Sequence, residues 1–455
     1  HIRGNRYTRG YLSFICTASG PLNNIEMKNV VVEDTESTQG GGNNYSGGLV
    51  AYTSSDVTNV HMENVKILMP KSYYVGGVLG QMQTYGPNFM GNTIKNFVVN
   101  AYSNVGGLVG MDYSKATDGN QAVDGKVTGT NTVGGLYGYK STTGNGSTNQ
   151  RDWLVSNVAV TATSGRAGGA IGYSFHASSQ NAKILNCTIK GTTFVGGYEG
   201  GNGGTGTRNT YNLQVVGCTI ENTLEDAGES DFKKIGVGGV YGNQSSEQNV
   251  RMWGITVRDC KIIGPKYVGG IIGAAAFTQD RFFIDRIYVA EDVTVTARQS
   301  MAGGFVGYAE RITITDSACG ATVTAGRSEA GGIIGHVEPQ FDEIRVKLKN
   351  VYYKGRVSAG TDYAGGVIGK LNSSGSLKVD DSLMNGVLVA ADVRAASETS
   401  LWINNTNPNT SAGTGLIYIC EDSLINGQTA RDLVSMDAAA EEEHYVIPKR
   451  LDNVK

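Results

Sequence analysis

Hydrophobic and polar positions alternate in short segments over most of the chain. Segments such as IEMKNVVVED from residue 25, VTNVHMENVKI from residue 57 and WLVSNVAVTA from residue 153 are rich in Val, Ile and Asn. A period of two with many β-branched residues is typical of strands that bury one face, and helical periodicity is weak. The pattern therefore predicts an all-β chain built from many short strands.

Between these segments, a six-residue phrase of the form small, Gly, Gly, apolar, apolar, Gly recurs eleven times. Its copies begin at residues 46, 75, 105, 133, 167, 195, 237, 268, 302, 330 and 364. The mean spacing of about 32 residues lies in the range of stacked repeat architectures. Because each repeat offers about three strands, the sequence predicts a β-solenoid, or parallel β-helix, of about eleven coils with one phrase per coil.

The glycine pair of the phrase predicts a corner. Positions one and four are both apolar but cannot share one face of an uninterrupted strand, because side chains alternate. We expect glycine to supply either a positive φ or room for a neighbouring backbone at this corner. The structural glycines named on this basis are Gly76, Gly77, Gly106, Gly107, Gly269 and Gly270. Position five admits Tyr137, Glu199 and Tyr241, so we expect it to face outward.

Asparagine recurs near one place in the strand segments. Asn29, Asn96, Asn157 and Asn186 occupy similar positions in their repeats. Two explanations remain open. Inward-facing asparagines at a corner would form a hydrogen-bonded ladder along the stack, whereas solvated turn residues would have no such partners.

The phrase, followed by I-x-N and alternating apolar residues, resembles the GLUG repeat of bacterial surface proteins over roughly residues 25 to 390. That repeat occurs in large adhesin-like proteins of gut bacteria and in the non-catalytic region of IgA1-cleaving zinc metalloproteases. The resemblance implies a β-solenoid and an extracellular or cell-surface location. It does not select one function, because one fold can serve different activities.

We expect residues 1–24 to be an N-terminal cap, 25–390 one long solenoid, and 391–455 a C-terminal cap and charged linker, in which Leu416 to Ile419 form a final strand.

The chain has 65 glycines among 455 residues and 17% charged residues, which suits thin coils. A net charge of −3 without a basic run argues against nucleic-acid binding. No apolar run reaches the ~18 residues of a membrane span. The start at His1 suggests a segment of a longer polypeptide.

Three cysteines fall in one column of consecutive repeats. Cys187 and Cys260 each precede a phrase by the same interval, and Cys218 has the matching sequence context. Buried free thiols explain this spacing, and a disulfide between neighbouring coils remains an alternative. No CxxC motif or Cys/His pairing predicts a metal site.

No catalytic constellation emerges from the sequence. The five histidines are widely separated, and the HExxH pattern of zinc proteases is absent. Asp380 and Asp381 have the form of the carboxylate pairs in glycan-cleaving enzymes, but no basic or histidine partner recurs beside them, so a solvated turn is the favoured explanation. We therefore expect this chain to be no enzyme and to need no cofactor or metal.

Tyrosines and long loops are the candidates for binding. The candidate binding residues are Tyr137, Tyr139, Tyr173, Tyr198 and Tyr241, which would form a stripe along one face. The loops at 140–152 and 200–236 would lie beside it. Tyrosine is also simply a good strand former. The sequence favours a non-catalytic adhesion module for a host glycan or protein. The alternative is a spacer or substrate-positioning region of a secreted zinc metalloprotease whose catalytic domain lies outside this chain.

Overall fold

The computed structural model describes residues 1–371 except 4–10, 35–44, 143–149, 176–177, 204–207, 229–233, 245–249, 276–281 and 338–342, and only short stretches beyond residue 371. Two compact units are present. Unit 1 comprises residues 1–223 and 239–243, and unit 2 comprises residues 224–238 and 244–455.

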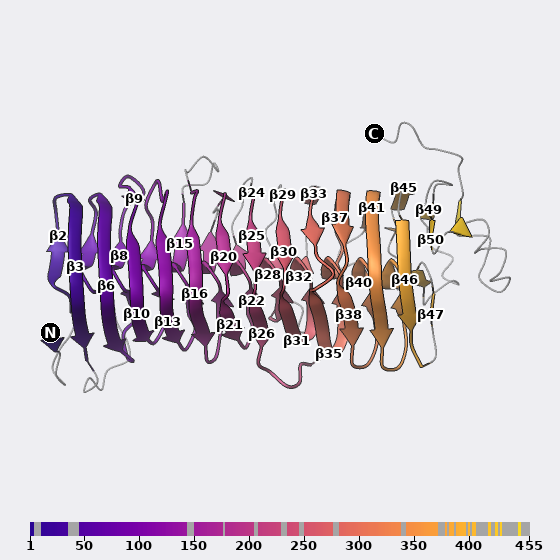
Figure 1. The fold of residues 1–455 in the computed structure, drawn as a ribbon, viewed down its shortest axis with the longest axis horizontal. Helices are drawn as coiled ribbons and strands as arrows, with labels where there is room; N and C mark the ends of the chain where they lie inside the picture. The colour runs from indigo at the N-terminus through magenta and orange to yellow at the C-terminus, as the bar shows by residue number, and fades with distance from the viewer. Residues whose placement is uncertain are drawn as a thin grey trace. The chain divides into compact units, whose positions relative to one another are not determined.

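All regular structure in the described residues is β-strand, and nearly every pairing is parallel (Figure 1). The predicted β-solenoid is therefore confirmed. Residues about one repeat apart stand side by side, as in the pairing of Val30 with Val65 and of Val65 with Phe97. The exception is β50 (Leu424–Ile425), which pairs antiparallel with β51 (Gln428–Thr429).

Each turn of unit 1 contributes strands to three parallel ladders. The first ladder contains β3 (Leu22–Glu33), β6 (Val57–Met69), β10 (Thr93–Ala101), β13 (Gln121–Gly129), β16 (Leu154–Ala162), β20 (Lys183–Leu185), β21 (Thr188–Gly191), β25 (Gln214–Val216) and β26 (Thr219–Asn222). The second contains β4 (Tyr45–Gly47), β7 (Tyr74–Gly76), β11 (Val105–Gly106), β14 (Thr132–Gly134), β17 (Arg166–Gly168) and β22 (Phe194–Gly196). The third contains β2 (Ile15–Ala18), β5 (Val50–Thr53), β8 (Leu79–Met82), β12 (Val109–Asp112), β15 (Tyr137–Ser141), β18 (Ile171–Phe175) and β23 (Glu199–Gly203).

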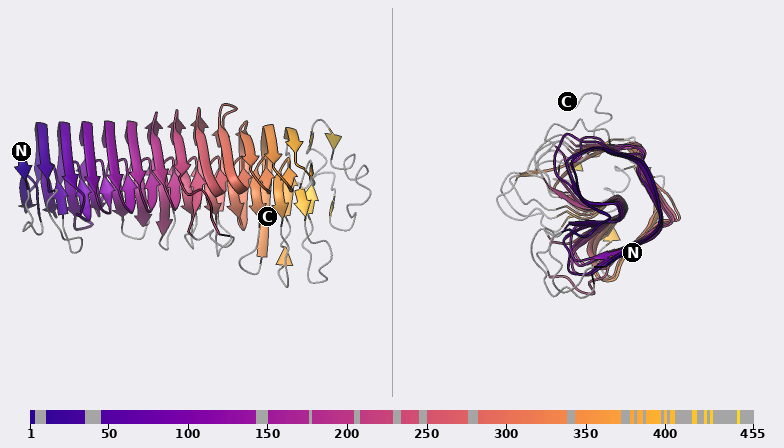
Figure 2. Two further views of the ribbon diagram at one scale, coloured as in Figure 1. Left: turned by 90° about the horizontal axis from the view of Figure 1, so that it is seen from below. Right: turned by 90° about the vertical axis from the view of Figure 1, so that its left-hand side faces the viewer.

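Shorter strands complete unit 1, and the end-on view shows its successive turns following one bent outline (Figure 2). These strands are β1 (Ile2–Arg3), β9 (Phe89–Met90), β19 (Ser179–Gln180) and β24 (Arg208–Tyr211). Strand β2 pairs with β5, so the stacked strands begin before residue 25, inside the segment expected to be a cap.

Unit 2 repeats the same plan. Its first ladder contains β29 (Val250–Trp253), β30 (Thr256–Arg258), β31 (Lys261–Gly269), β33 (Phe282–Asp285), β34 (Tyr288–Val289), β35 (Thr294–Gly303), β37 (Arg311–Cys319), β38 (Thr322–Ala325), β41 (Glu343–Ala359), β44 (Lys378–Val379), β45 (Ser382–Asn385), β46 (Leu388–Arg394), β49 (Ile417–Ile419) and β52 (Tyr445–Val446). The shorter phrase strands are β27 (Gly236–Gly238), β39 (Ala330–Gly331), β42 (Ala364–Gly365) and β47 (Thr399–Ser400). The strands after the corner are β32 (Ile272–Ala275), β36 (Val306–Ala309), β40 (Ile334–Val337), β43 (Ile368–Leu371) and β48 (Ile403–Asn405).

The C-terminal strand predicted from Leu416 to Ile419 is present as β49, of which Leu416 lies outside the described residues. Strand β49 pairs in parallel with β45 and also with β52. Stacked strands therefore continue beyond residue 390.

The glycine pair does form a corner, and its role is close approach. The chain bends after the second glycine of the phrase, as between β7 and β8. A Cβ atom at Gly77 would lie inside van der Waals contact with the carbonyl oxygen of Gly107, and one at Gly107 would meet that of Gly135. Positive φ does not explain these positions, because the phrase glycines of the described turns lack it. Gly76, Gly106, Gly269 and Gly270 are equally crowded by backbone.

The asparagine ladder exists, but it lies on the outside. Asn64 donates from Nδ2 to Oδ1 of Asn29 at 3.0 Å, and Asn96 donates to Asn64 at 2.6 Å. Asn157 donates in the same way to Asp124 at 2.9 Å. All of these residues have φ near +50°, which asparagine and aspartate tolerate better than other side chains. The expected inward orientation is wrong, because the left-handed residue turns its side chain to solvent.

The cysteines of the predicted column are buried thiols and not disulfides. Cys187 and Cys218 of unit 1 and Cys260 of unit 2 are all about 1% exposed, as is Cys319, and none of the four is in a disulfide. The backbone N–H of Cys187 donates to Sγ of Cys218 at 3.4 Å. The neighbouring thiol of Cys218 and burial raise the pKa of the Cys187 thiol, and burial raises the pKa of Cys319 to about 12. These thiols are therefore part of the packed interior.

Candidate functional site

Three of the five predicted binding tyrosines are buried. Tyr137, Tyr198 and Tyr241 each have 0% exposure, so the expectation that phrase position five faces outward is wrong. The bend at the glycine pair resets the alternation, and position five becomes the first inward residue of the strand that follows. These tyrosines therefore offer no surface to a ligand.

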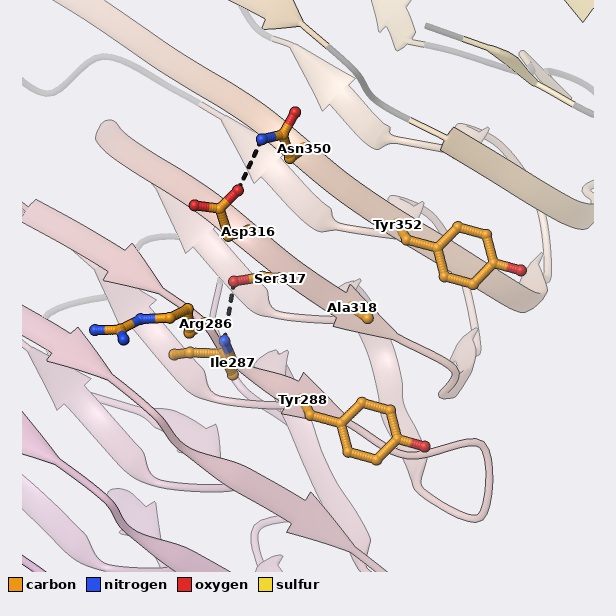
Figure 3. A pocket seen from close by; sticks show the side chains of 8 residues that line it. All are labelled: Arg286, Ile287, Tyr288, Asp316, Ser317, Ala318, Asn350 and Tyr352. Atoms are coloured by element: carbon orange, nitrogen blue, oxygen red, sulfur yellow. Dashed lines mark hydrogen bonds between the residues drawn. The ribbon is translucent and has the colours of Figure 1, made fainter.

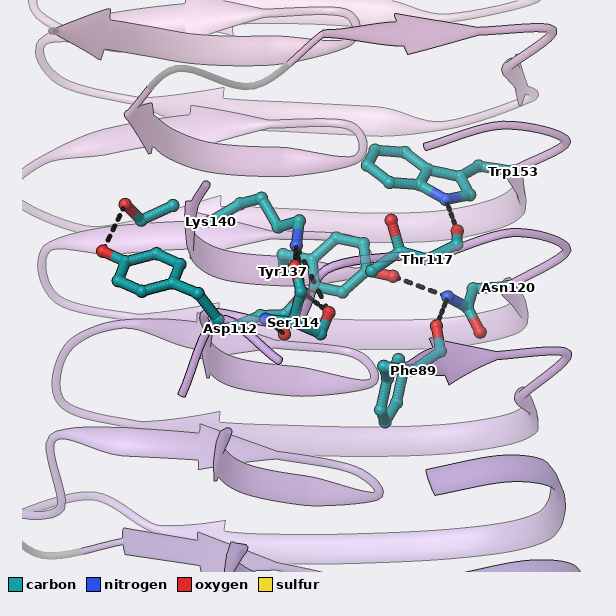
Figure 4. Close-up of polar contacts among 10 residues, drawn as sticks. Phe89, Asp112, Ser114, Thr117, Asn120, Tyr137, Lys140 and Trp153 are labelled. Atoms are coloured by element: carbon teal, nitrogen blue, oxygen red, sulfur yellow. Dashed lines mark hydrogen bonds and ion pairs between the residues drawn. The ribbon is translucent and has the colours of Figure 1, made fainter. Parts of the chain in front are cut away.

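The buried tyrosines stack on other aromatic rings inside unit 1. The ring of Trp153 lies 5.0 Å from that of Tyr137 and 6.2 Å from that of Tyr198. The Tyr137 hydroxyl accepts a hydrogen bond from Nδ2 of Asn120 at 2.8 Å (Figure 4). Burial raises the pKa values of Tyr137, Tyr198 and Tyr241. Tyr137 thus has its hydroxyl satisfied in the interior, as expected for a buried tyrosine.

Tyr139 and Tyr173 are partly exposed and adjacent. They are register partners on β15 and β18, with ring centroids 5.8 Å apart. Tyr113 and Tyr85 extend this row. The ring centroid of Tyr113 lies 6.1 Å from that of Tyr139, and the ring centroid of Tyr85 lies 5.1 Å from that of Tyr113. We call these four residues the tyrosine row. Burial raises the pKa of Tyr113 to about 12. Tyr139 and Tyr173 lie against each other, and Tyr85 at the end of the row is 42% exposed.

The described part of unit 1 holds two buried ion pairs that the sequence did not predict. Lys140 Nζ lies 2.7 Å from Oδ2 of Asp112, and both side chains have 0% exposure (Figure 4). The Asp112 carboxylate also accepts from the N–H and Oγ of Ser114 at 2.9 and 3.0 Å. Burial lowers the pKa of Lys140 despite Asp112. Glu199 forms the second pair, with Arg208. Because both ion pairs are closed to solvent, they contribute to the packed interior and cannot contact a ligand.

In unit 2, a buried group of charged side chains centres on Glu329. Glu329 Oε2 lies 3.1 Å from Nδ1 of His336, and Glu329 Oε1 lies 3.2 Å from Nζ of Lys370. Burial alone would raise the pKa of Glu329, but the hydrogen bond with His336 and the charge of Lys370 outweigh it and hold the pKa below its usual value. Nothing in the sequence could have paired these residues without the register of β40 and β43.

An open groove lies on the outer face of unit 2, across β34, β37 and β41 (Figure 3). Its volume is about 450 Å³. The lining residues are Arg286, Ile287, Tyr288, Asp316, Ser317, Ala318, Asn350 and Tyr352. Sequence analysis missed this groove, because its two tyrosines lie in the strand segments and not in the phrase.

The two groove tyrosines are among the most exposed aromatic side chains of the described residues. Tyr288 is 46% exposed and Tyr352 is 40% exposed. Tyr288 pairs in register with Ala318, which in turn pairs with Tyr352. Both rings extend the same way along their strands, with the small Ala318 between them (Figure 3). The alanine leaves the space over the central strand open.

A column of polar corner residues borders the groove. Arg286, Asp316 and Asn350 have φ values of 50°, 46° and 52°, so each lies at the same left-handed bend of its turn. Asn350 Nδ2 donates to Oδ1 of Asp316 at 2.8 Å, and Arg286 Nε donates to Asp285 at 2.8 Å. Below them, the Ile287 N–H donates to Ser317 Oγ at 3.1 Å. Hydrogen bonds thus fix the groove on a rigid strand scaffold.

The remaining predicted features lie wholly or partly outside the described residues. Asp380 and Asp381 are outside, as are parts of the loops at 140–152 and 200–236. Among the residues that the structure places, no group of three or more His, Cys, Asp or Glu could hold a metal ion. In the same part of the chain, no helix has the length and apolar character to cross a membrane.

Comparisons with protein-family models, with curated proteins and with solved structures gave no match. The function is therefore inferred from the residues of this chain alone.

Proposed function

We propose that this chain is a non-catalytic binding or adhesion module of an extracellular bacterial surface protein. Its solenoid serves as a rigid scaffold, and its principal contact surface is the groove between Tyr288 and Tyr352. The observation that carries the proposal is the exposure of these two rings at 46% and 40%, on either side of Ala318.

Exposed tyrosines in this position favour binding for a physical reason. Some large aromatic side chains are buried in the interior, as at Tyr137 and Trp153, whereas the two groove rings are exposed. Tyrosine gives a large amphipathic contact area and loses little conformational entropy when it is ordered by a ligand. The parallel ladder fixes the backbone positions of both tyrosines before binding, which reduces the entropic cost further.

The extracellular location and the bacterial surface context rest on the resemblance of the repeated phrase to GLUG repeats. The many small apolar and glycine positions that carry this resemblance are needed for tight coils. The groove is the feature that adds a specific activity to that scaffold.

An array of immobilised glycans and proteins tests the proposal. The full chain should bind a defined set of spots, and the double variant Tyr288→Ser/Tyr352→Ser should lose them while its thermal melt is unchanged. Tyr139→Ser/Tyr173→Ser in the tyrosine row is the matched control and should bind normally. If the groove variant binds as well as the wild-type chain, the groove is not the contact surface.

A further inference from the structure

The spacing of the two groove tyrosines selects an extended ligand. Tyr288 and Tyr352 are separated by one intervening strand, β37. Two inter-strand steps place their backbones ~10 Å apart. A single small ring can cover only one of them. A linear chain of sugar rings can stack one ring on each tyrosine, with another ring crossing Ala318 between them.

The polar column beside the rings suits sugar hydroxyls. Figure 3 shows Arg286, Asp316 and Asn350 in one row on one side of the groove, with the two tyrosines on the other. Together they present guanidinium donors, a carboxylate acceptor and an amide with both functions. All three are exposed corner residues, so they can hydrogen-bond a ligand that runs across the strands.

Charge indicates what kind of sugar chain fits. Between Val346 and Ala359, strand β41 carries Lys347, Lys349, Lys354 and Arg356 and no acidic residue, although the whole chain has a net charge of −3. Lys349 and Lys354 are exposed on either side of the Asn350–Tyr352 segment of the groove. Arg356 pairs with Asp392 at 3.3 Å. The basic edge therefore complements an anionic ligand.

We propose that the groove binds an acidic polysaccharide, a linear glycan whose sugars carry carboxylate or sulfate groups. The glycan runs across β34, β37 and β41, with sugar rings on Tyr288 and Tyr352. Its hydroxyls reach Asp316 and Asn350, and its anionic groups lie near Lys349 and Lys354. This inference rests on the proposed binding function and names the ligand class of the same groove.

Single-stranded nucleic acid is the rival ligand, because it too combines stacking with negative charge. The groove fits it less well. Asp316 lies within the groove and Asp285 at its border, and a phosphate backbone would bring one charge per nucleotide against them. An acidic glycan can also carry one charge per sugar, but each sugar has free ring hydroxyl groups that can face these carboxylates while its charge points away.

Calorimetric titration of the full chain tests the inference. The probes are polygalacturonate as the carboxylated glycan, heparin as the sulfated one, dextran as the neutral one and oligo(dT) as the nucleic acid. We expect one or both acidic glycans to bind, dextran and oligo(dT) to bind at least tenfold more weakly, and affinity to fall with added salt. Lys349→Gln/Lys354→Gln should weaken acidic glycan binding about tenfold, which is the size expected when two exposed charge contacts are lost.

Controls separate failure of this inference from failure of the proposed function. Lys66→Gln/Lys126→Gln, at exposed positions of unit 1, should bind like the wild-type chain. Equal binding of dextran, or tighter binding of oligo(dT), would overturn the acidic-glycan assignment. If no glycan binds but a protein on the array binds and is lost in Tyr288→Ser/Tyr352→Ser, the inference fails and the proposed function survives.

Discussion

Gly107 shows how little space separates successive turns at the level of one residue. Its α-carbon faces the carbonyl of Gly135 so closely that a methyl group cannot fit without a shift of backbone. Gly86, in contrast, has no heavy atom within 4 Å of the place where its Cβ would be. The two positions form a matched pair, because both take the same substitution and only one is crowded.

We expect Gly107→Ala to lower the free energy of unfolding by about 1–3 kcal/mol, the usual cost of overpacking. Gly86→Ala should leave it unchanged or raise it slightly, because alanine restricts the unfolded chain. Urea melts of both variants are the measurement. Equal stability of the two would mean that the phrase glycines are merely tolerated.

Glu329 makes a prediction for the pH dependence of stability. Its folded-state pKa lies below its usual value of 4.5, so the unfolded chain binds more protons in this range. The stabilisation is fully present above pH 4.5 and is lost as the pH falls through the lowered pKa. We expect Glu329→Gln to reduce the slope of stability against pH below 4.5. Chemical melts over a pH series measure that slope, and an unchanged slope would contradict the assignment.

The sequence could not predict whether individual tyrosine side chains face the interior or the solvent. Alternation predicts which side chains share a face only while a strand is uninterrupted. The bend after the glycine pair restarts the inward–outward alternation of side chains. The pattern therefore predicted an outward orientation for Tyr137, Tyr198 and Tyr241, which are buried. Tyr139 and Tyr173, two residues further along their strands than position five, are adjacent and partly exposed, and their role in binding stays a prediction.

At the level of elements, the outer ladder of asparagine and aspartate fixes where each long strand bends. Asn64 has φ of 56° and hydrogen-bonds to Asn29 and Asn96 in the flanking turns. Its backbone conformation and its side-chain contacts can be separated by two substitutions, since glycine keeps the first and removes the second.

We expect Asn64→Ala to lower the free energy of unfolding by about 1–2 kcal/mol, because alanine is strained in the left-handed backbone conformation and cannot form either hydrogen bond. Asn64→Gly should cost less. Lys66→Ala, an exposed change on the same strand β6, should have almost no effect. Urea melts rank the three, and an alanine variant as stable as the glycine variant would show that the bend carries no strain.

The elements themselves were largely predictable, but the pairs between turns were not. Strands such as β6 and β10 follow directly from the alternation, and the recurring asparagine left a ladder between them as one of two open explanations. The ion pair of Asp112 and Lys140 depends on register, because the two residues face each other only when β12 and β15 align. The groove depends on register in the same way, through Tyr288, Ala318 and Tyr352.

At the level of the whole molecule, strands after residue 390 cover strand edges of unit 2. β42 pairs with β47, β43 with β48 and β45 with β49. A parallel sheet that loses such partners presents free N–H and C=O groups that can pair with another chain.

We therefore expect removal of residues 391–455 to cause aggregation, seen as high-mass species by light scattering after gel filtration. Removal of residues 447–455 alone leaves every described strand in place and is the control. A longer deletion that elutes as cleanly as this control would argue that the segment does not protect the stack.

The central claim is that the groove across β34, β37 and β41 is the binding surface of the molecule. Hydrogen-exchange mass spectrometry of the full chain, with and without the tightest ligand from the array, tests it most directly. The account predicts slower exchange in peptides that contain residues 286–288, 316–318 and 350–352, with unit 1 unchanged. Protection confined to the tyrosine row of unit 1, with none at the groove, would contradict it.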